Sequence, residues 1–404
     1  MYVRFCKLAV GVVALILSTA SVLSGATVLV LRFHNLSPYS DLNWVGESIA
    51  ETVRVELSAA KEIVLGRDAR EEGLKRLQLR PDAQFTKATL LKLGQTLGVD
   101  FLCYGSFDVK PENGNTSPAA LKDSSVQIAA HYLDLRKMRD GKDFSEAGKL
   151  SDLSRLEEHL AWQSLKYLEP ETDRPVEQYL APQKFIRLEA KESYARGLLS
   201  TSQDQQAQWF RQANMLDSRL AGPAYELGKL SAAKRDYRQA ITWFGRVPAT
   251  DPRYIDARFR MGLAAYRAGD FNASVNYYRE VAKHLPTNEV FNNLGAAENQ
   301  MNMPAAIDDF RRAADGDAND TVYLFNLGAA LLKTNQFDEA TRRLQAVVDR
   351  EPEDQQARAL LERASRREPA PSNAKPLAPD RLKETVDETT FRQVKALLQP
   401  KGQS

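Results

Sequence analysis

The chain contains very little cysteine and histidine, and this limits the chemistry it can perform. Of its 404 residues only Cys6 and Cys103 are cysteines, and Cys6 lies in an apolar N-terminal segment. A disulfide within the chain after that segment and a cysteine-based zinc site are therefore excluded. Cys103 lies in a strand-like run, which predicts a buried, unreactive thiol. None of the four histidines has a second histidine or a cysteine at ligand spacing.

An excess of charge of one sign is also missing, and so are the common catalytic motifs. The 55 Lys and Arg residues balance 53 Asp and Glu residues, so the composition does not indicate a nucleic-acid partner. No HExxH sequence, phosphate-binding glycine-rich loop or GxSxG sequence is present. The adjacent Glu157 and Glu158 are predicted to be solvated on a helix. These absences favour a protein that is not an enzyme and that uses no metal or cofactor.

The first 26 residues have the pattern of a secretory leader. Arg4 and Lys7 precede an apolar run that extends to Leu17, and small residues follow it up to Ala26. We interpret residues 1–26 as a signal peptide, with an uncleaved membrane anchor as the alternative. The protein is therefore expected to be exported, and to be periplasmic or associated with the cell envelope.

Residues 27–168 alternate between strand-like and helix-like segments. The runs at 27–31 and 101–109 are rich in β-forming residues, and 88–97 and 153–168 have the apolar spacing of amphipathic helices. Mixed elements in this order predict a compact α/β sandwich domain.

The same region contains four short sequences in a characteristic order: VLRFHNLS at 30–37, WVGE at 44–47, LGVDFLCYGS at 97–106 and VQIAAHYLD at 126–134. With these sequences, most of 27–168 resembles the TolB-N-like domain. The resemblance implies an α/β fold with no catalytic residues, and in that family the domain commonly precedes tetratricopeptide repeats. Arg32 and His34 depart from the family pattern, which usually has a proline and an acid there.

Four glycines recur at intervals of 34, 33 and 33 residues, at Gly228, Gly262, Gly295 and Gly328. Each is followed by a small residue and, four positions later, by an aromatic residue or leucine, and three of the four units then end in proline. This register resembles the tetratricopeptide repeat, which pairs two antiparallel helices in about 34 residues. Each glycine is expected where the two helices of a unit cross, and four repeats are predicted at 221–354.

The remaining segments frame these two parts. Proline and charged residues at 169–184 predict a linker, and 185–220 resembles a degenerate helical pair that would cap the repeats. After the repeats we expect a capping helix at 355–367, a proline-rich spacer at 368–381, and an amphipathic C-terminal helix and tail at 382–404. The predicted fold is an α/β sandwich domain followed by an all-α tetratricopeptide-type solenoid.

In tetratricopeptide folds the first helix of each unit lines a concave face, and the register places specific positions there. These positions form an apolar, partly aromatic trough with a few cations, which suits a partner segment that is apolar and partly acidic. Leu263 and Ala296 stand where a clamp for a C-terminal carboxylate needs asparagine, so that clamp is not predicted. Alternatively, the chain's own C-terminal helix fills the trough. The predicted groove residues are Tyr225, Lys229, Phe259, Leu263, Tyr266, Arg267, Asn292, Asn299, Gln300, Phe325, Leu332 and Lys333.

The function predicted from these features is that of a non-enzymatic scaffold or adaptor at the cell envelope, which binds partner proteins through the concave face. One alternative is a component of an outer-membrane assembly or export complex that oligomerises through the N-terminal α/β domain. A hydrolase with an unrecognised site is a third hypothesis. No nucleic-acid partner is expected, and membrane association would occur through the N-terminus.

Overall fold

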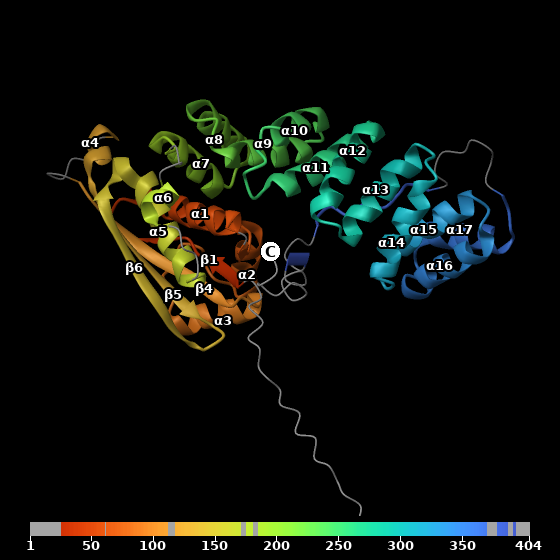
Figure 1. The fold of residues 1–404 in the computed structure, drawn as a ribbon, viewed down its shortest axis with the longest axis horizontal. Coiled ribbons are helices and arrows are strands. Elements are labelled where there is room, and N and C mark those ends of the chain that lie inside the picture. Colours follow the sequence, from red (N-terminus) through yellow and green to blue (C-terminus); the bar gives the residue numbers. More distant parts are fainter. Residues whose placement is uncertain are drawn as a thin grey trace, which may run out of the picture.

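A mixed α/β domain is followed by a curved row of paired helices (Figure 1). The computed structural model describes residues 26–60, 62–111, 118–170, 175–180, 185–369, 378–386 and 391–392. The predicted leader at 1–26 therefore lies outside the described residues except for Ala26, as does the end of the predicted C-terminal helix and tail after residue 392.

A six-stranded sheet forms the centre of the N-terminal domain. Its order is β3-β1-β4-β5-β6, and β2 pairs with β4 off this path. β1 is parallel to β3 and β4, and β2 is parallel to β4, whereas β4, β5 and β6 are antiparallel. The strands are β1 (Thr27–Val30), β2 (His34–Asn35), β3 (Ile63–Val64), β4 (Phe101–Lys110), β5 (Ser125–Asp134) and β6 (Arg139–Lys149).

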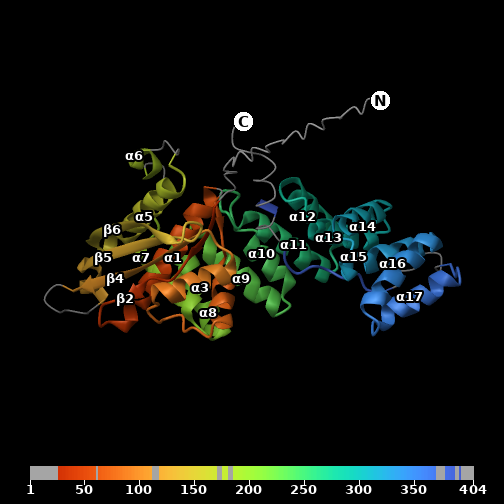
Figure 2. The same cartoon turned by 90° about the horizontal axis from the view of Figure 1, so that it is seen from below.

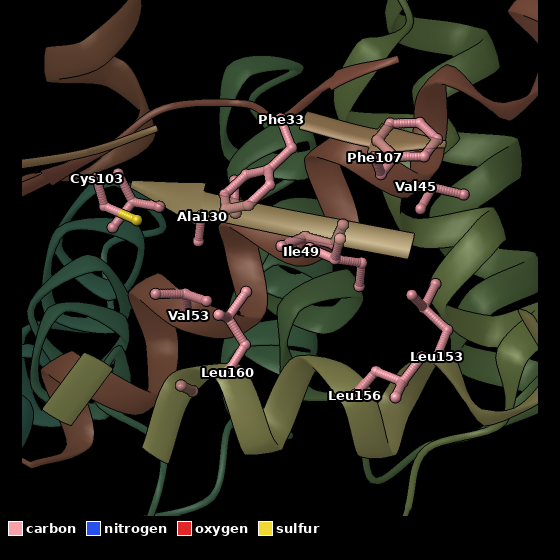
Figure 3. Packing of buried hydrophobic residues seen from close by; sticks show 14 of the residues in the cluster. Phe33, Val45, Ile49, Val53, Cys103, Phe107, Ala130, Leu153, Leu156 and Leu160 are labelled. Carbon is pink, nitrogen blue, oxygen red and sulfur yellow. The ribbon is translucent and has the colours of Figure 1, made fainter. Parts of the chain in front are cut away.

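Helices cover both faces of this sheet because alternate side chains of β1 point to opposite sides. Val28 and Val30 belong to a core with α1 (Asn43–Ala59) and α5 (Leu153–Leu168), part of which is drawn in Figure 3. Leu29 belongs to a second core with α2 (Arg67–Arg76) and α3 (Lys87–Leu97). The short helices of this domain are η1 (Ser40–Leu42), α4 (Pro118–Asp123) and η3 (Leu150–Asp152).

Five antiparallel helix pairs and one further helix form the described part of the solenoid. Together with the α/β domain they confirm the predicted fold class, while the specific resemblance to the TolB-N-like domain stays a prediction. The helices are α7 (Leu188–Leu199), α8 (Gln203–Leu216), α9 (Ala221–Ala233), α10 (Tyr237–Phe244), α11 (Tyr254–Arg267), α12 (Phe271–His284), α13 (Asn288–Gln300), α14 (Ala305–Gly316), α15 (Thr321–Lys333), α16 (Phe337–Arg350) and α17 (Gln355–Ser365).

The repeated glycines lie where the two helices of each pair touch. A Cβ atom placed on Gly262 would come within 2.8 Å of the Tyr278 ring, and one on Gly295 within 2.9 Å of the Phe310 ring. Gly228 and Gly328 have the same relation to the second helix of their own pairs. The expected close crossing is thus present in all four units, and any larger side chain there would have to push the helices apart.

Each first helix of these pairs also ends in the same way. Arg235, Gly269, Asn302 and Asn335 follow α9, α11, α13 and α15, and all have positive φ angles between 55° and 79°. A left-handed residue at this position ends an α-helix and reverses the chain. The second helix of each unit can therefore fold back against the first.

The solenoid begins directly on the α/β domain rather than after a free linker. α7 packs along α1, and a short helix, α6 (Val176–Leu180), forms inside the predicted linker at 169–184. The Tyr179 hydroxyl donates to Glu56 of α1 at 2.7 Å, which fixes this short helix to the domain.

Buried ions hold the two parts together at this junction. Lys191 of α7 lies 2.6 Å from Glu157 of α5, and Thr52 of α1 donates to the same carboxylate at 2.8 Å. Glu157 is fully buried and Glu158 is 6% exposed, so the prediction that both are solvated is wrong. The reason is that Lys191 of α7 reaches the Glu157 carboxylate and supplies its countercharge.

Candidate functional site: an occupied concave groove

A segment of the chain's own C-terminal region lies in the concave groove. We call residues 378–386 the strap; it crosses α15, α13 and α11, in the order opposite to that of the repeats (Figure 2). It is non-helical throughout. Within 382–404, where a C-terminal helix and tail are predicted, residues 382–386 are not helical and residues 391–392 are helical.

Asparagines bind the main chain of the strap, which explains why it is not a helix. Asn293 accepts a hydrogen bond from the Lys383 N–H and donates to the Lys383 carbonyl, both at 2.8 Å. Asn326 does the same for Arg381, at 2.9 Å and 2.7 Å. These backbone groups are thus taken by side chains of the solenoid instead of by helical hydrogen bonds.

A third asparagine completes this clamp. Asn292 donates to the Arg381 carbonyl at 2.9 Å, and its own oxygen accepts from Asn326 at 2.8 Å. Asn292, Asn293 and Asn326 are all buried, at 1% exposed or less. Buried amides of this kind are stabilising only when they are paired, and here the strap supplies the missing partners.

The first acidic residue of the strap lies in a polar pocket. Asp380 accepts hydrogen bonds from Asn299 and Gln300, each at 2.7 Å, and from the Tyr266 hydroxyl at 3.1 Å. Burial raises the pKa of Asp380, and the three donors offset this only in part. Burial lowers the pKa of the nearby Lys333, although Asp380 acts in the opposite direction.

Each of the two basic side chains of the strap contacts both an aromatic ring and a carboxylate of the solenoid. The Arg381 guanidinium lies 3.4 Å from the Phe325 ring centre and 2.6 Å from Asp354. Lys383 lies 4.7 Å from the ring centre of Tyr323 and 2.5 Å from Asp320. Such ring contacts stabilise a cation more strongly when it is partly desolvated.

Two further contacts place the rest of the strap. Leu382 packs, partly buried, against two hydrophobic clusters of the solenoid, one that contains Phe325 and one that contains Leu263. Glu384 forms an ion pair with Arg267 at the exposed rim. The strap is therefore held by alternating charges about a central leucine, in addition to the asparagine clamp.

The structure places the predicted groove residues in two groups. Six of them contact the strap through the hydrogen bonds, ion pair and ring contact described above. Of the others, Phe259, Leu263 and Leu332 belong to the hydrophobic clusters on which Leu382 packs. Tyr225 donates to Asp256 and Lys229 pairs with Glu226 at 3.2 Å, while Phe259 and Leu332 are fully buried in the core. The six that contact the strap are Tyr266, Arg267, Asn292, Asn299, Gln300 and Phe325.

Sequence reasoning missed the two asparagines that bind both main-chain groups of a residue. Asn293 and Asn326 occupy the same register position in consecutive repeats, where the first two units have Glu226 and Arg260. A matching asparagine in two units was a readable signal, because asparagine has no packing advantage on a helix. It was overlooked because the rows assigned to the concave face included the neighbouring position but not this one.

The described residues show neither a metal-binding cluster nor a reactive thiol. They contain no group of three or more His, Cys, Asp or Glu residues placed to hold a metal ion. Cys103 is buried, and burial raises its pKa to about 12, as expected for an unreactive thiol. Within the same residues, no helix has the length and apolarity that crossing a membrane requires.

Comparisons with known proteins bear on the repeats. Two family models, both described as tetratricopeptide repeat, match residues 259–321 and 300–364. Residues 259–364 form tetratricopeptide repeats. The matches leave the N-terminal domain unassigned, and no curated protein matches the chain by sequence.

Several solved structures resemble part of the chain. YrrB, a tetratricopeptide protein with an unusual peptide-binding site, is 17% identical, with a TM-score of 0.39 over 44% of this chain and 92% of its own. MamA from Desulfovibrio magneticus RS-1 is 20% identical, with a TM-score of 0.38 over 41% and 97%. PilF of Pseudomonas aeruginosa is 18% identical, with a TM-score of 0.37 over 44% and 83%.

Proposed function

We propose that the protein is a non-enzymatic scaffold of the cell envelope whose concave groove binds a non-helical segment of a partner protein. Tetratricopeptide repeats indicate protein–protein interaction in general. The observation that carries the proposal is the clamp of Asn292, Asn293 and Asn326, which holds the main chain of a bound segment. A clamp on main-chain groups accepts any segment that adopts the same backbone path.

The chemistry of the groove specifies the kind of segment. The pocket of Tyr266, Asn299 and Gln300 presents three donors to one carboxylate, and Arg267 presents a cation to another. Between them the groove contacts an apolar side chain, that of Leu382 in the strap. These contacts support a partner segment that is apolar and partly acidic.

The envelope location rests on the leader pattern. Arg4 and Lys7 followed by an apolar run and small residues are typical of a segment that directs export. Fractionation of the native host tests it: the protein is expected in the periplasmic or envelope fraction and shorter than its full translated length. Recovery of the uncut chain in the cytoplasm would refute this part of the proposal.

The groove itself is tested by crosslinking and affinity purification from envelope extract. The double variant Asn293→Ala with Asn326→Ala is expected to lose at least tenfold of the partner recovered by the unchanged protein, because both main-chain clamps are removed. The control is Asn319→Ala, at an exposed asparagine whose oxygen accepts only from Arg350. Equal recovery by both variants would show that partners bind elsewhere.

Oligomerisation through the α/β domain, as part of an outer-membrane assembly or export complex, is the alternative carried over from the sequence. Light scattering tests it. The full chain is used because the isolated domain would expose a face of α1 that α7 covers. A monomer at all concentrations would remove this alternative.

A further inference from the structure

We propose that the strap is a built-in competitor for the partner, and that the partner segment carries the same alternation of acidic and basic residues about a central leucine. This inference rests on the proposed function of the groove. It adds the sequence pattern of the ligand, read from the residues that the groove contacts in the strap. It also adds that the partner must displace the strap before it can bind.

The pattern follows from one subsite for each of five consecutive residues. Asp380 and Glu384 meet the donor pocket and Arg267, and Leu382 between them meets the hydrophobic clusters. Side chains two apart share one face of an extended chain, so these three form a single row that ends at the exposed Glu384.

The two residues between them have subsites of the opposite charge. Arg381 meets Phe325 and Asp354, and Lys383 meets Tyr323 and Asp320. Asp320 and Asp354 also accept hydrogen bonds from the first turns of α15 and α17, so they are held in place without the strap. The full pattern is therefore acidic, basic, leucine, basic, acidic.

The strap is built to exchange rather than to remain fixed. Its main chain is bound by neutral asparagines, and Leu382 is only partly buried. Its ion pair with Arg267 involves a Glu384 side chain that is 61% exposed. An exposed ion pair of this kind contributes little, about 0–1 kcal/mol. The pairs of Arg381 with Asp354 and of Lys383 with Asp320 are mostly buried, so a second chain that replaces the strap has to supply both cations.

The covalent link between the strap and the groove determines how strongly the strap competes with an added peptide. A segment joined to its own binding site by a short flexible connection has an effective concentration of about 1 mM. If the free segment binds the groove with a Kd of about 10 μM, the tethered strap weakens the binding of an added copy of the segment by about 100-fold. Weakening the strap should therefore reveal a binding site that the unchanged chain conceals.

The test uses a fluorescent peptide with the sequence of residues 378–386 and the full-length protein. The unchanged protein is expected to bind it weakly, and the variant Leu382→Asp is expected to bind it at least tenfold more tightly in anisotropy titrations. A second variant, Asp380→Asn with Glu384→Gln, is also expected to bind the peptide more tightly than the unchanged protein does, but by a smaller factor. A control peptide with aspartate at the leucine position should bind neither protein.

Three results would overturn the inference. The first is that the unchanged protein and the Leu382→Asp variant bind the peptide with equal affinity. The second is that the Leu382→Asp variant binds both peptides with equal affinity, and the third is a concentration-dependent dimer in light scattering that Leu382→Asp abolishes. The last result would show that the strap binds a second copy of the chain.

Envelope purification separates this inference from the proposed function. If Asn293→Ala with Asn326→Ala reduces partner recovery but Leu382→Asp does not increase it, the groove binds partners and only the competition is refuted. If partner recovery is insensitive to the asparagine variants, the proposed use of the groove itself is refuted.

Discussion

The solenoid holds other parts of the same chain at two places, and it does so with opposite chemistry. Near its N-terminal end, buried ions join it to the α/β domain: Lys191 of α7 pairs with Glu157, and Arg253, just before α11, pairs with Glu51. In the groove of its later units, neutral asparagines hold the strap, and the ion pairs lie around them.

This difference separates a permanent contact from an exchangeable one. Breaking a buried ion pair leaves an uncompensated charge away from water, which costs about 3–5 kcal/mol. A buried asparagine that loses a main-chain partner can be satisfied by water or by another chain at a much lower cost. The junction therefore fixes one arrangement of the two parts, whereas the groove can change its occupant.

The largest effect is expected at the junction. Lys191→Met should lower the free energy of unfolding by about 3–5 kcal/mol, because Glu157 is fully buried and loses its cation. The measurement is chemical denaturation followed by circular dichroism. The matched control is Lys229→Met, whose pair with Glu226 is partly exposed and should cost about 1 kcal/mol or less. Equal losses would mean that the junction is not held by its buried charges.

The pH dependence of stability is the next largest effect, and two junction carboxylates act in opposite directions. Burial would raise the pKa of Glu51, but Arg54 and Arg253 outweigh it and hold this pKa at about 2. The stabilisation from Glu51 is therefore complete above its unfolded pKa near 4.3 and is lost as pH falls toward 2. Burial raises the pKa of Glu158 to about 7, so its ionisation destabilises the fold as pH rises from about 4.3 to about 7.

Replacing Glu158 isolates the contribution of its carboxylate to the pH dependence of stability. Glu158→Gln should stabilise the protein at pH 8 by about 1–3 kcal/mol and should flatten the stability profile between pH 5 and pH 7. Thermal unfolding over pH 4–8 measures this. Glu72→Gln, which changes an exposed pair with Arg76, is the control and should leave the profile unchanged. An unaltered slope in Glu158→Gln would contradict the burial argument.

In the groove, a moderate and local effect is expected. Asn293→Ala with Asn326→Ala should reduce hydrogen-exchange protection of the Arg381 and Lys383 amides at least tenfold, because the two asparagine oxygens accept from those N–H groups. The global free energy of unfolding should fall by only about 1–2 kcal/mol, since the strap is the part released. Loss of protection throughout the repeats would show that the strap supports the solenoid itself.

The smallest effect is expected at the rim of the groove. Arg267→Gln should weaken strap protection less than fivefold, because its pair with Glu384 is largely exposed and is screened by salt. The difference from the unchanged protein should vanish in 0.5 M sodium chloride. A loss as large as that of the asparagine variant, or one that persists in salt, would place the main attraction at the rim.

The repeats could be predicted from sequence because their constraint is local and recurs. A glycine is needed wherever a Tyr or Phe of the second helix lies against the first, as at Gly262 and Gly295. β6 and α2 were not predicted, because both are polar: β6 has no buried residue and α2 buries only three. Their positions are set by the neighbours on which they pack rather than by their own patterns.

The site was predictable only where side chains follow the repeat register. Asn292, Asn299 and Gln300 could be assigned to the concave face by counting from the glycines. The C-terminal part of the chain was one of two predicted occupants, as a helix. The residues that it uses were not predictable, because Asp380 and Arg381 lie 80 or more residues further along the chain. The buried state of Glu157 was missed for the same reason, since its cation comes from a helix 34 residues away.

The spacing of the asparagines in the clamp determines the length of peptide that the groove can bind. Consecutive units each offer one amide at the same register position, and they grip main-chain groups of strap residues two apart. In the next unit toward the N-terminus this position is Arg260, which is engaged with Asp256. An asparagine there would face residue 385, so the length of peptide that such a solenoid can grasp should grow by two residues for every repeat that carries the amide.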